Sequence, residues 1–200
     1  MDEQTLAAYD AASPQFARDW RGQPAPTDLY ELLVAHFRPG PTVDIGCGTG
    51  RDTAWLAANG YAASGYDASE GLLRQARESC PAIRFGLAVL PELNGLVAGA
   101  YENVLCETVI MHLDPSVVGA ATRRLLALLR PSGTLFLSWR VTEGESMRDP
   151  SGRLYAAFDK RLVTGELAAG DTILLDQESV NLSSGKKVHR LIVRRSIAAP

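Results

Sequence analysis

The sequence lacks the features of a membrane-anchored, secreted or disulfide-bonded protein. No apolar run approaches the roughly 18 residues that a membrane-spanning helix requires. The three cysteines, Cys47, Cys80 and Cys106, form no C-x-x-C pair, which argues against a disulfide framework and against a zinc site. The acidic start (MDEQ) has no apolar segment after it and does not support a secretory signal. We therefore expect a soluble, cytoplasmic protein with no membrane partner.

A strong excess of either charge is also missing. The 20 basic and 23 acidic residues leave a formal net charge of −3, which gives no electrostatic reason to expect a polyanionic partner. The hydrophobic fraction of 46% and the charged fraction of 22% are typical of globular proteins, and 200 residues suffice for one domain with a buried core. Glycine, with 18 residues, is the one unusual count, and it raises the question of where the backbone must approach another group closely.

Strand-like and helix-like segments alternate through most of the chain. An N-terminal helix (3–20), a linker (21–27) and a second helix (28–37) come first. We then expect strands at 42–45, 61–66, 83–86, 101–106 and 134–139, with helices at 51–58, 69–79 and 115–129. Such alternation predicts right-handed crossovers and a parallel sheet. A helix at 154–167 follows, and two β-rich runs, 172–182 and 187–195, predict an antiparallel hairpin at the end.

The most specific feature is a glycine-rich turn between the first of these strands and the helix after it, with the sequence VDIGCGTGR at 43–51. In open α/β sheets, ligands of the nucleotide type bind at such a turn. The dinucleotide fingerprint would need glycine where Arg51 stands, and no Gly-Lys-Ser/Thr follows as in a Walker A loop. Asp44 precedes the first glycine by two residues, and its carboxylate suits a ligand ammonium group better than a pyrophosphate.

This turn, with Asp44, Gly46, Gly48 and Gly50, resembles the cofactor loop of class I S-adenosylmethionine-dependent methyltransferases. Asp67 ends the next strand, 17 residues after Gly50, where the family has an acid that binds both ribose hydroxyls. Residues 129–135 are similar to the family's turn into its fifth strand. The resemblance runs from about 9 to 140. It implies an α/β, Rossmann-like three-layer sandwich whose mostly parallel seven-stranded sheet ends in an antiparallel β-hairpin.

On this resemblance we expect one methyltransferase domain over residues 1–200. Its parts are an N-terminal helix or lid with a linker (1–27), a cofactor-binding core (28–140), and a substrate-side loop, helix and hairpin (141–200). The implied ligand is S-adenosyl-L-methionine, held by residues of the glycine turn, the strand ends and the N-terminal helix: Tyr9, Asp44, Gly46, Cys47, Gly48, Thr49, Gly50, Asp67, Ala68, Ala88, Val89, Leu90, Cys106 and Glu107. Segment 85–91 has no acid for the adenine amino group, so apolar contacts and backbone groups near 87–90 are expected there.

Two residues after the fourth strand are candidates for catalysis. Methyl transfer from a sulfonium needs alignment, and it needs a base only when the nucleophile carries a proton. His112 is the first candidate for that base or for orienting the substrate, although it could also be a structural histidine at a helix start. Glu107 is an acid at the end of an apolar strand, where it seldom benefits the core. We place no metal, because the carboxylate set of catechol-type relatives cannot be located.

The substrate side is less specific in sequence. Phe16, with Tyr9, lies in a segment similar to the helix that covers the cofactor in many small-molecule members, although an amphipathic helix packed on the core would look the same. Arg140, Arg148, Arg153 and Tyr155 could bind a carboxylate or phosphate, or the arginines could simply be solvated. The basic residues of the terminal hairpin protect a sheet edge more simply than they predict a nucleic-acid partner.

These features predict an enzyme that transfers a methyl group to an O, N or S atom of a small molecule. The alternative is a module that binds S-adenosylmethionine or S-adenosylhomocysteine without turnover. A nucleic-acid or protein methyltransferase is a weaker alternative, and Arg51 opposes a dehydrogenase. The sequence does not identify the acceptor atom, the pathway or the oligomeric state.

Overall fold

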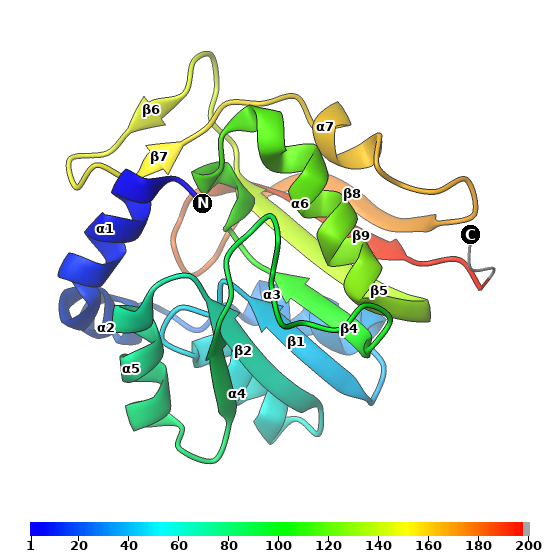
Figure 1. Cartoon of the computed structure of the whole chain (residues 1–200), viewed down its shortest axis with the longest axis horizontal. Helices are drawn as coiled ribbons and strands as arrows, with labels where there is room; N and C mark the ends of the chain where they lie inside the picture. The colour runs from blue at the N-terminus through cyan, green and yellow to red at the C-terminus, as the bar shows by residue number, and fades with distance from the viewer. Residues whose placement is uncertain (198–200) are drawn as a thin grey trace.

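A seven-stranded sheet forms the centre of the computed structural model, which describes residues 1–197; the last residues of the expected domain, 198–200, lie outside the described part. The strand order is β3-β2-β1-β4-β5-β9-β8 (Figure 1). The first five strands in this order are parallel, whereas β9 is antiparallel to β5 and to β8. The strands are β1 (Pro41–Ile45), β2 (Ala62–Asp67), β3 (Arg84–Leu87), β4 (Tyr101–Cys106), β5 (Leu129–Arg140), β8 (Thr172–Val180) and β9 (Lys187–Arg194). The predicted fold class is confirmed.

Helices cover both faces of the sheet. Leu105, Phe136 and Ile192 occupy one row across β4, β5 and β9 and pack against α3 (Thr27–His36) and α4 (Arg51–Ala58). Further along the same row, Phe85 packs against α5 (Glu70–Ser79). The residues next to these in each strand point the other way, as pleating requires, and form the larger core cluster with α6 (Pro115–Leu128). Both faces are therefore buried, as the apolar strands predict.

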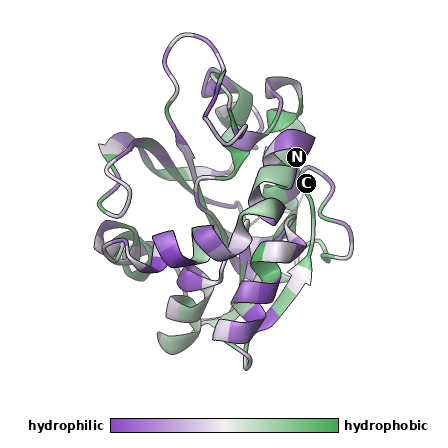
Figure 2. Cartoon of the chain, turned by 90° about the vertical axis from the view of Figure 1, so that its left-hand side faces the viewer, coloured by the Kyte–Doolittle hydropathy of each residue, from purple (hydrophilic) through white to green (hydrophobic). Residues whose placement is uncertain are grey.

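Two short helices cross the molecule at the carboxyl ends of the parallel strands. The expected N-terminal helix is divided at Ala12 into α1 (Glu3–Ala11) and α2 (Ser13–Arg21), with Pro14 in the first turn of α2. Both helices contact α5. Figure 2 views the molecule from this side, and the ribbons nearest the viewer carry hydrophilic stretches interrupted by hydrophobic ones. We call α1 and α2 the lid helices.

The expected helix at 154–167 is wrong. Leu154–Tyr155 forms a short strand, β7, which pairs with β6 (Met147–Arg148), and only Arg161–Thr164 is helical (α7). The reason is tertiary: the Leu154 backbone N–H donates to Thr5 Oγ1 at 2.8 Å, and the Ala156 N–H donates to the Met111 carbonyl at 2.8 Å. Contacts with segments far away in the chain therefore override the expected helix. The other expected elements lie within a few residues of their predicted positions, and β5 begins earlier, at Leu129.

No helix among residues 1–197 is long and apolar enough to cross a membrane.

A buried ion pair joins the start of α3 to β9, and its removal should destabilise the fold. The Asp28 carboxylate accepts a hydrogen bond from Arg190, whose side chain is 3% exposed. We expect Asp28→Ala to lower the free energy of unfolding by about 3 kcal/mol, because it leaves a buried guanidinium without its counter-charge. Chemical denaturation measures the change. Glu31→Ala, on the exposed side of the same helix, is the control and should change it by less than about 0.5 kcal/mol; equal losses would contradict the prediction.

Candidate active site

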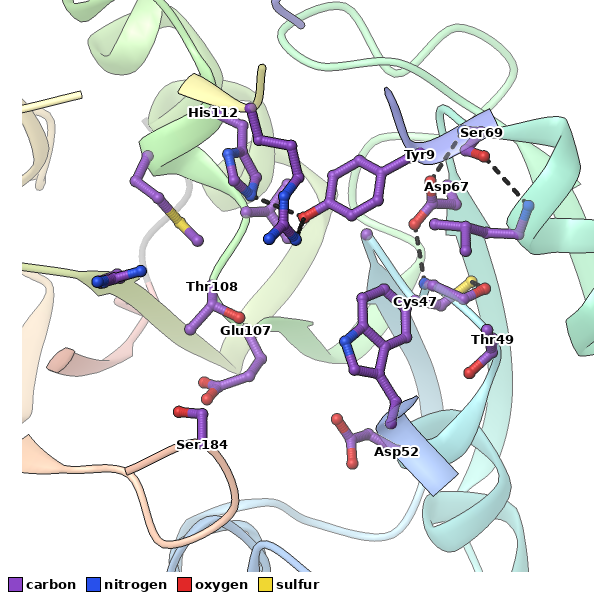
Figure 3. A pocket seen from close by; sticks show the side chains of 18 of the residues that line it. Tyr9, Cys47, Thr49, Asp52, Asp67, Ser69, Glu107, Thr108, His112 and Ser184 are labelled. Carbon is purple, nitrogen blue, oxygen red and sulfur yellow. Dashed lines mark hydrogen bonds between the residues drawn. The ribbon is translucent and has the colours of Figure 1, made fainter. Parts of the chain in front are cut away.

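A cavity of about 360 Å³ opens at the carboxyl ends of the parallel strands, beneath the lid helices (Figure 3). The glycine turn and the end of β2 line one side of it, and residues 107–112, after β4, line another. The remaining wall comes from the lid helices, from Arg140, Arg153 and Tyr155, and from the loop between β8 and β9. This position, where strand order reverses between β1 and β4, is the usual ligand site of an open α/β sheet.

The glycine turn is closely covered, and side chains are excluded from it. Gly46 has φ +75°, and a Cβ atom there would lie 2.2 Å from Val109 Cγ2. Gly48 has φ +54°, and its Cβ would lie 2.9 Å from Cζ3 of Trp20, a lid residue. Both positions therefore require glycine for backbone conformation and for space. Residues 46–49 of the turn nevertheless line the cavity.

Asp67 joins the glycine turn to the next strand. Its Oδ2 accepts a hydrogen bond from the Gly48 N–H at 2.8 Å, and its Oδ1 accepts one from the Ser69 N–H at 2.8 Å. Burial raises the pKa of this carboxyl group, and the backbone donors oppose that shift. Asp10 of α1 is tied to the same place, since its Oδ1 accepts from Ser69 Oγ at 2.6 Å and from the Gly71 N–H at 3.0 Å. The lid is thereby fastened beside Asp67.

Tyr9 and His112 form a buried pair across the cavity. The Nδ1–H of His112 donates to the Leu154 carbonyl at 2.5 Å, which leaves Nε2 as the acceptor for Tyr9 OH at 3.0 Å. Burial lowers the pKa of His112 to about 4 and raises that of Tyr9 to about 12, so both are neutral at physiological pH. The tyrosine oxygen also accepts from Arg153 at 3.3 Å. Both ring nitrogens of His112 are thus occupied by protein groups.

Glu107 points into the cavity from the end of β4 (Figure 3). Its Oε2 accepts a hydrogen bond from Ser138 Oγ, and its Oε1 accepts one from Asn181 Nδ2 at 3.0 Å. Burial raises the pKa of Glu107 to about 7, although the hydrogen bond from Ser138 opposes the rise. This carboxyl group can therefore hold or release a proton near neutral pH.

The cationic side chains at the cavity differ in their partners. Arg153 pairs with Asp149 at 2.6 Å and lies over the Tyr9 and Phe16 rings. Arg140 lies 4.7 Å from the centre of the Tyr155 ring, and neither it nor Lys186 has a carboxylate partner among residues 1–197. Two positive charges at the cavity are thus uncompensated.

Twelve of the sequence-predicted site residues line the cavity: Tyr9, Gly46, Cys47, Gly48, Thr49, Asp67, Ala68, Glu107, His112, Arg140, Arg153 and Tyr155. The others do not: Phe16, Asp44, Gly50, Ala88, Val89, Leu90, Cys106 and Arg148.

Their contacts explain these positions. Asp44 shares the row of Leu105, so it points toward α4, where it accepts from Thr53 Oγ1 at 2.6 Å, and burial raises its pKa to about 8. Cys106 belongs to the core cluster on the opposite face. Arg148 is paired with Asp2 at 2.8 Å and braces the lid.

Known proteins resemble this chain in sequence and in fold. Residues 42–133 match the model of a methyltransferase domain. Ubiquinone biosynthesis O-methyltransferase of Methylococcus capsulatus is 40% identical over 104 residues, which are 48% of this chain and 41% of the relative. Trans-aconitate 2-methyltransferase of Methylobacterium nodulans is 31% identical over 163 residues, which are 80% of this chain and 57% of the relative. Among solved structures, 1,6-didemethyltoxoflavin-N1-methyltransferase of Burkholderia thailandensis matches with a TM-score of 0.76 at 22% identity, covering 96% of this chain and 88% of that one.

Residues 42–133 are thus a methyltransferase domain, and these matches support the class I S-adenosylmethionine-dependent family that the sequence resembles. The family predicted from the glycine turn and the acid after the next strand is therefore confirmed. The chain spans about half the length of the two curated relatives, and the substrates in their names are theirs.

Several cavity residues of this family member escaped the sequence reasoning. Trp20 carries no signal of its own, because its place over Gly48 depends on how the lid docks. The β8–β9 loop (181–186) was interpreted only as a turn, and it contributes Asn181, Ser183, Ser184 and Lys186 to the wall. The strand directions indicate where this loop lies. Because β9 is antiparallel to β5, the loop just before β9 lies at the edge of the sheet where the parallel strands end.

Glu107 should make stability depend on pH. Its pKa is about 7 in the folded protein and near 4.5 when unfolded, so the folded state binds the proton more tightly. Stability should therefore fall as pH rises from about 4.5 to 7, by on the order of 2 kcal/mol after allowance for partial exposure. Asp44 adds a fall of the same sign that extends to about pH 8.

Glu107→Gln should remove the part of this fall that lies between about pH 4.5 and 7 and should leave the Asp44 part. Denaturation curves at several pH values measure both. The exposed Glu92→Gln is the matched control. An unchanged pH dependence in Glu107→Gln would show that Glu107 titrates normally.

Proposed function

We propose that this chain is an S-adenosylmethionine-dependent methyltransferase acting on a small molecule. The observation that carries the proposal is that two sides of one cavity have different chemistry. One side has the glycine turn and Asp67, and the other has a titratable carboxyl group and two cations without carboxylate partners. The first side suits a nucleoside-type cofactor, and the second suits a polar acceptor held beside it.

S-adenosylmethionine fits the first side by its chemistry. Asp67 lines the cavity, and because each carboxylate oxygen can accept more than one hydrogen bond, Asp67 suits the ribose hydroxyls beside its backbone donors. Residues 46–49 of the glycine turn line the cavity together with Ala68, so a ligand in the cavity can contact the turn. When bound, this cofactor supplies a methyl group that is already activated on a sulfonium. The protein then has to align the acceptor and exclude water.

The acceptor carries a negative group in this proposal. Arg140 is held over Tyr155 and Lys186 extends from the β8–β9 loop, and neither is neutralised by a carboxylate among the described residues. An anionic acceptor would provide the missing counter-charge, and a guanidinium binds carboxylate or phosphate in a fixed geometry. Arg153 faces the same cavity but already has Asp149, so it contributes less.

Glu107 is the group that takes up a proton from the acceptor. Its pKa of about 7 suits a base at neutral pH, and each of its oxygens retains one free lone pair. His112 suits this role less well, because its pKa is lowered to about 4 and Tyr9 occupies its only acceptor nitrogen. We assign His112 to holding Tyr9, and with it the lid, over the cavity.

Asp67→Ala should weaken binding of S-adenosylhomocysteine by about 10- to 100-fold, since hydrogen bonds to a charged group are lost. Isothermal titration calorimetry measures the affinity. Asp67→Asn, which preserves shape, should weaken it less, and Glu78→Ala, exposed on α5, is the control that should change nothing. Unchanged affinity in both Asp67 variants would remove the ribose assignment. Absence of binding by the unaltered protein would overturn the proposed function.

A screen of small acids that reads out S-adenosylhomocysteine release should identify the acceptor. With an anionic acceptor, Arg140→Met and Lys186→Met should each raise KM by about tenfold, because one charge contact is lost. Lys187→Met is the control, since Lys187 pairs with Glu178 and Glu143 outside the cavity. Turnover of neutral acceptors alone would contradict the anionic assignment, and binding without turnover of any acceptor would favour a binding module.

A further inference from the structure

Asn181 is a buried amide whose orientation is determined by its neighbours. It begins the β8–β9 loop and is 5% exposed. Its Oδ1 accepts three hydrogen bonds from the loop: from the N–H groups of Ser183 and Ser184 at 3.0 and 2.9 Å, and from Ser184 Oγ at 3.2 Å. These donors require an oxygen at that position, so the amide nitrogen must face the other way.

The amide nitrogen of Asn181 faces Glu107. Nδ2 donates to Glu107 Oε1 at 3.0 Å, while Ser138 of β5 donates to Oε2. The carboxylate is thus held from both sides, by β5 and by the β8–β9 loop, whose donors lie 31 and 74 residues further along the chain. In Figure 3 the Glu107 carboxylate lies close to Ser184 of the same loop. An aspartate at 181 would lack the donor and a serine would lack the second polar atom, so asparagine alone among these serves both the loop and Glu107.

The β8–β9 loop is also tied to the cofactor side of the cavity. Ser183 Oγ accepts from Arg51 at 3.1 Å and donates to Gln23 Oε1 at 3.1 Å. Arg51 follows directly after the glycine turn, and Gln23 follows α2. The loop that holds Glu107 is therefore placed relative to the glycine turn by direct hydrogen bonds. Reorienting the loop would displace Lys186 and break the loop's hydrogen bonds to Glu107, Arg51 and Gln23.

We propose that Asn181 is a positioning residue that holds the Glu107 carboxylate toward the methyl acceptor and stabilises its ionised form. The inference rests on the proposed function, in which Glu107 takes up the acceptor's proton. In that step the acceptor's O–H or N–H bond breaks, the proton moves to a free lone pair of Glu107, and the electron pair stays on the acceptor atom. That pair would form the new bond to the methyl carbon, while the bond from this carbon to sulfur would break and leave its electron pair on sulfur.

Charged groups on two elements face Glu107 besides its hydrogen-bond donors. Arg51 and Asp52 lie at the start of α4, and Arg190 lies on β9. The two arginines favour the ionised carboxylate, whereas Asp52 and burial favour the protonated form. Because these influences oppose one another, we expect the loss of one hydrogen-bond donor to favour the protonated form of Glu107. Asn181 supplies a donor at the oxygen that Ser138 does not reach.

Asn181→Asp tests the proposal most directly. The variant keeps an oxygen that accepts from the three loop donors. Its other side-chain oxygen replaces the NH₂ group, so that a second carboxylate faces that of Glu107. Because two carboxylates in contact resist simultaneous ionisation, the upper apparent pKa of the pair should exceed that of Glu107 in the unaltered protein by about one unit or more. Carbon-13 NMR of the side-chain carboxyl groups in the unliganded protein measures this, with Glu107→Gln assigning the signal. The acid limb of the pH profile of kcat should move to higher pH by the same number of pH units, and KM should change by less than about twofold.

Asn94→Asp, an exposed change of the same charge, is the matched control and should leave the Glu107 signal unmoved. Asn181→Ala removes the donor without adding charge and should raise the pKa of Glu107 by a smaller amount. A Glu107 titration that is unchanged in both Asn181 variants would overturn the proposal, and so would a kcat loss without a shift of the acid limb. Calorimetry with S-adenosylhomocysteine distinguishes failure of the proposed function from failure of the role of Asn181. Absence of binding to the unaltered protein refutes the proposed function. Binding together with an unchanged Glu107 titration in the variants refutes only the role of Asn181.

Discussion

The reversal of strand order between β1 and β4 is the constraint on which the site depends. From β1, the chain builds outward through β2 and β3 on one side, and it returns to build β4, β5 and the hairpin on the other. Connections leave the carboxyl ends of β1 and β4 in opposite directions, so a crevice stays open between them. The glycine turn and Glu107 face each other across this crevice because each follows one of those two strands.

Two segments that are distant in sequence, the lid helices and the β8–β9 loop, close the crevice, and polar contacts hold them in place. The lid helices are attached through Asp10 to the start of α5 and through Asp2 to Arg148. The β8–β9 loop is attached through Ser183 to Arg51. The sheet beneath is instead held by large apolar clusters on both faces. Elements joined by few polar contacts open at lower cost than a packed core, which suits a cover that must admit a ligand.

Burial separates the protonation behaviour of the groups around the cavity. It raises the pKa of Glu107 to about 7 and lowers that of His112 to about 4, so the carboxyl group is the better proton acceptor at neutral pH. From the sequence, His112 is the first candidate for the base, with Glu107 as a further candidate. Which of the two is the better base depends on how far burial shifts each pKa and on the hydrogen bond from Tyr9 to Nε2 of His112. Neither can be read from the order of residues in the sequence.

The sequence by itself determined the fold class and the family, because local chemistry is sufficient for both. Positive φ at Gly46 and Gly48 requires glycine, apolar runs require burial, and an acid 17 residues after the turn marks the end of β2. Only the tertiary structure decided which polar side chains reach the cavity. Pleating directs Asp44 into the α4 layer, Arg148 is engaged by Asp2, and contacts to Thr5 and Met111 replace the expected helix at 154–167 with a strand. Asn181 and Lys186 reach the cavity because β9 pairs antiparallel with β5, a contact between segments far apart in the chain.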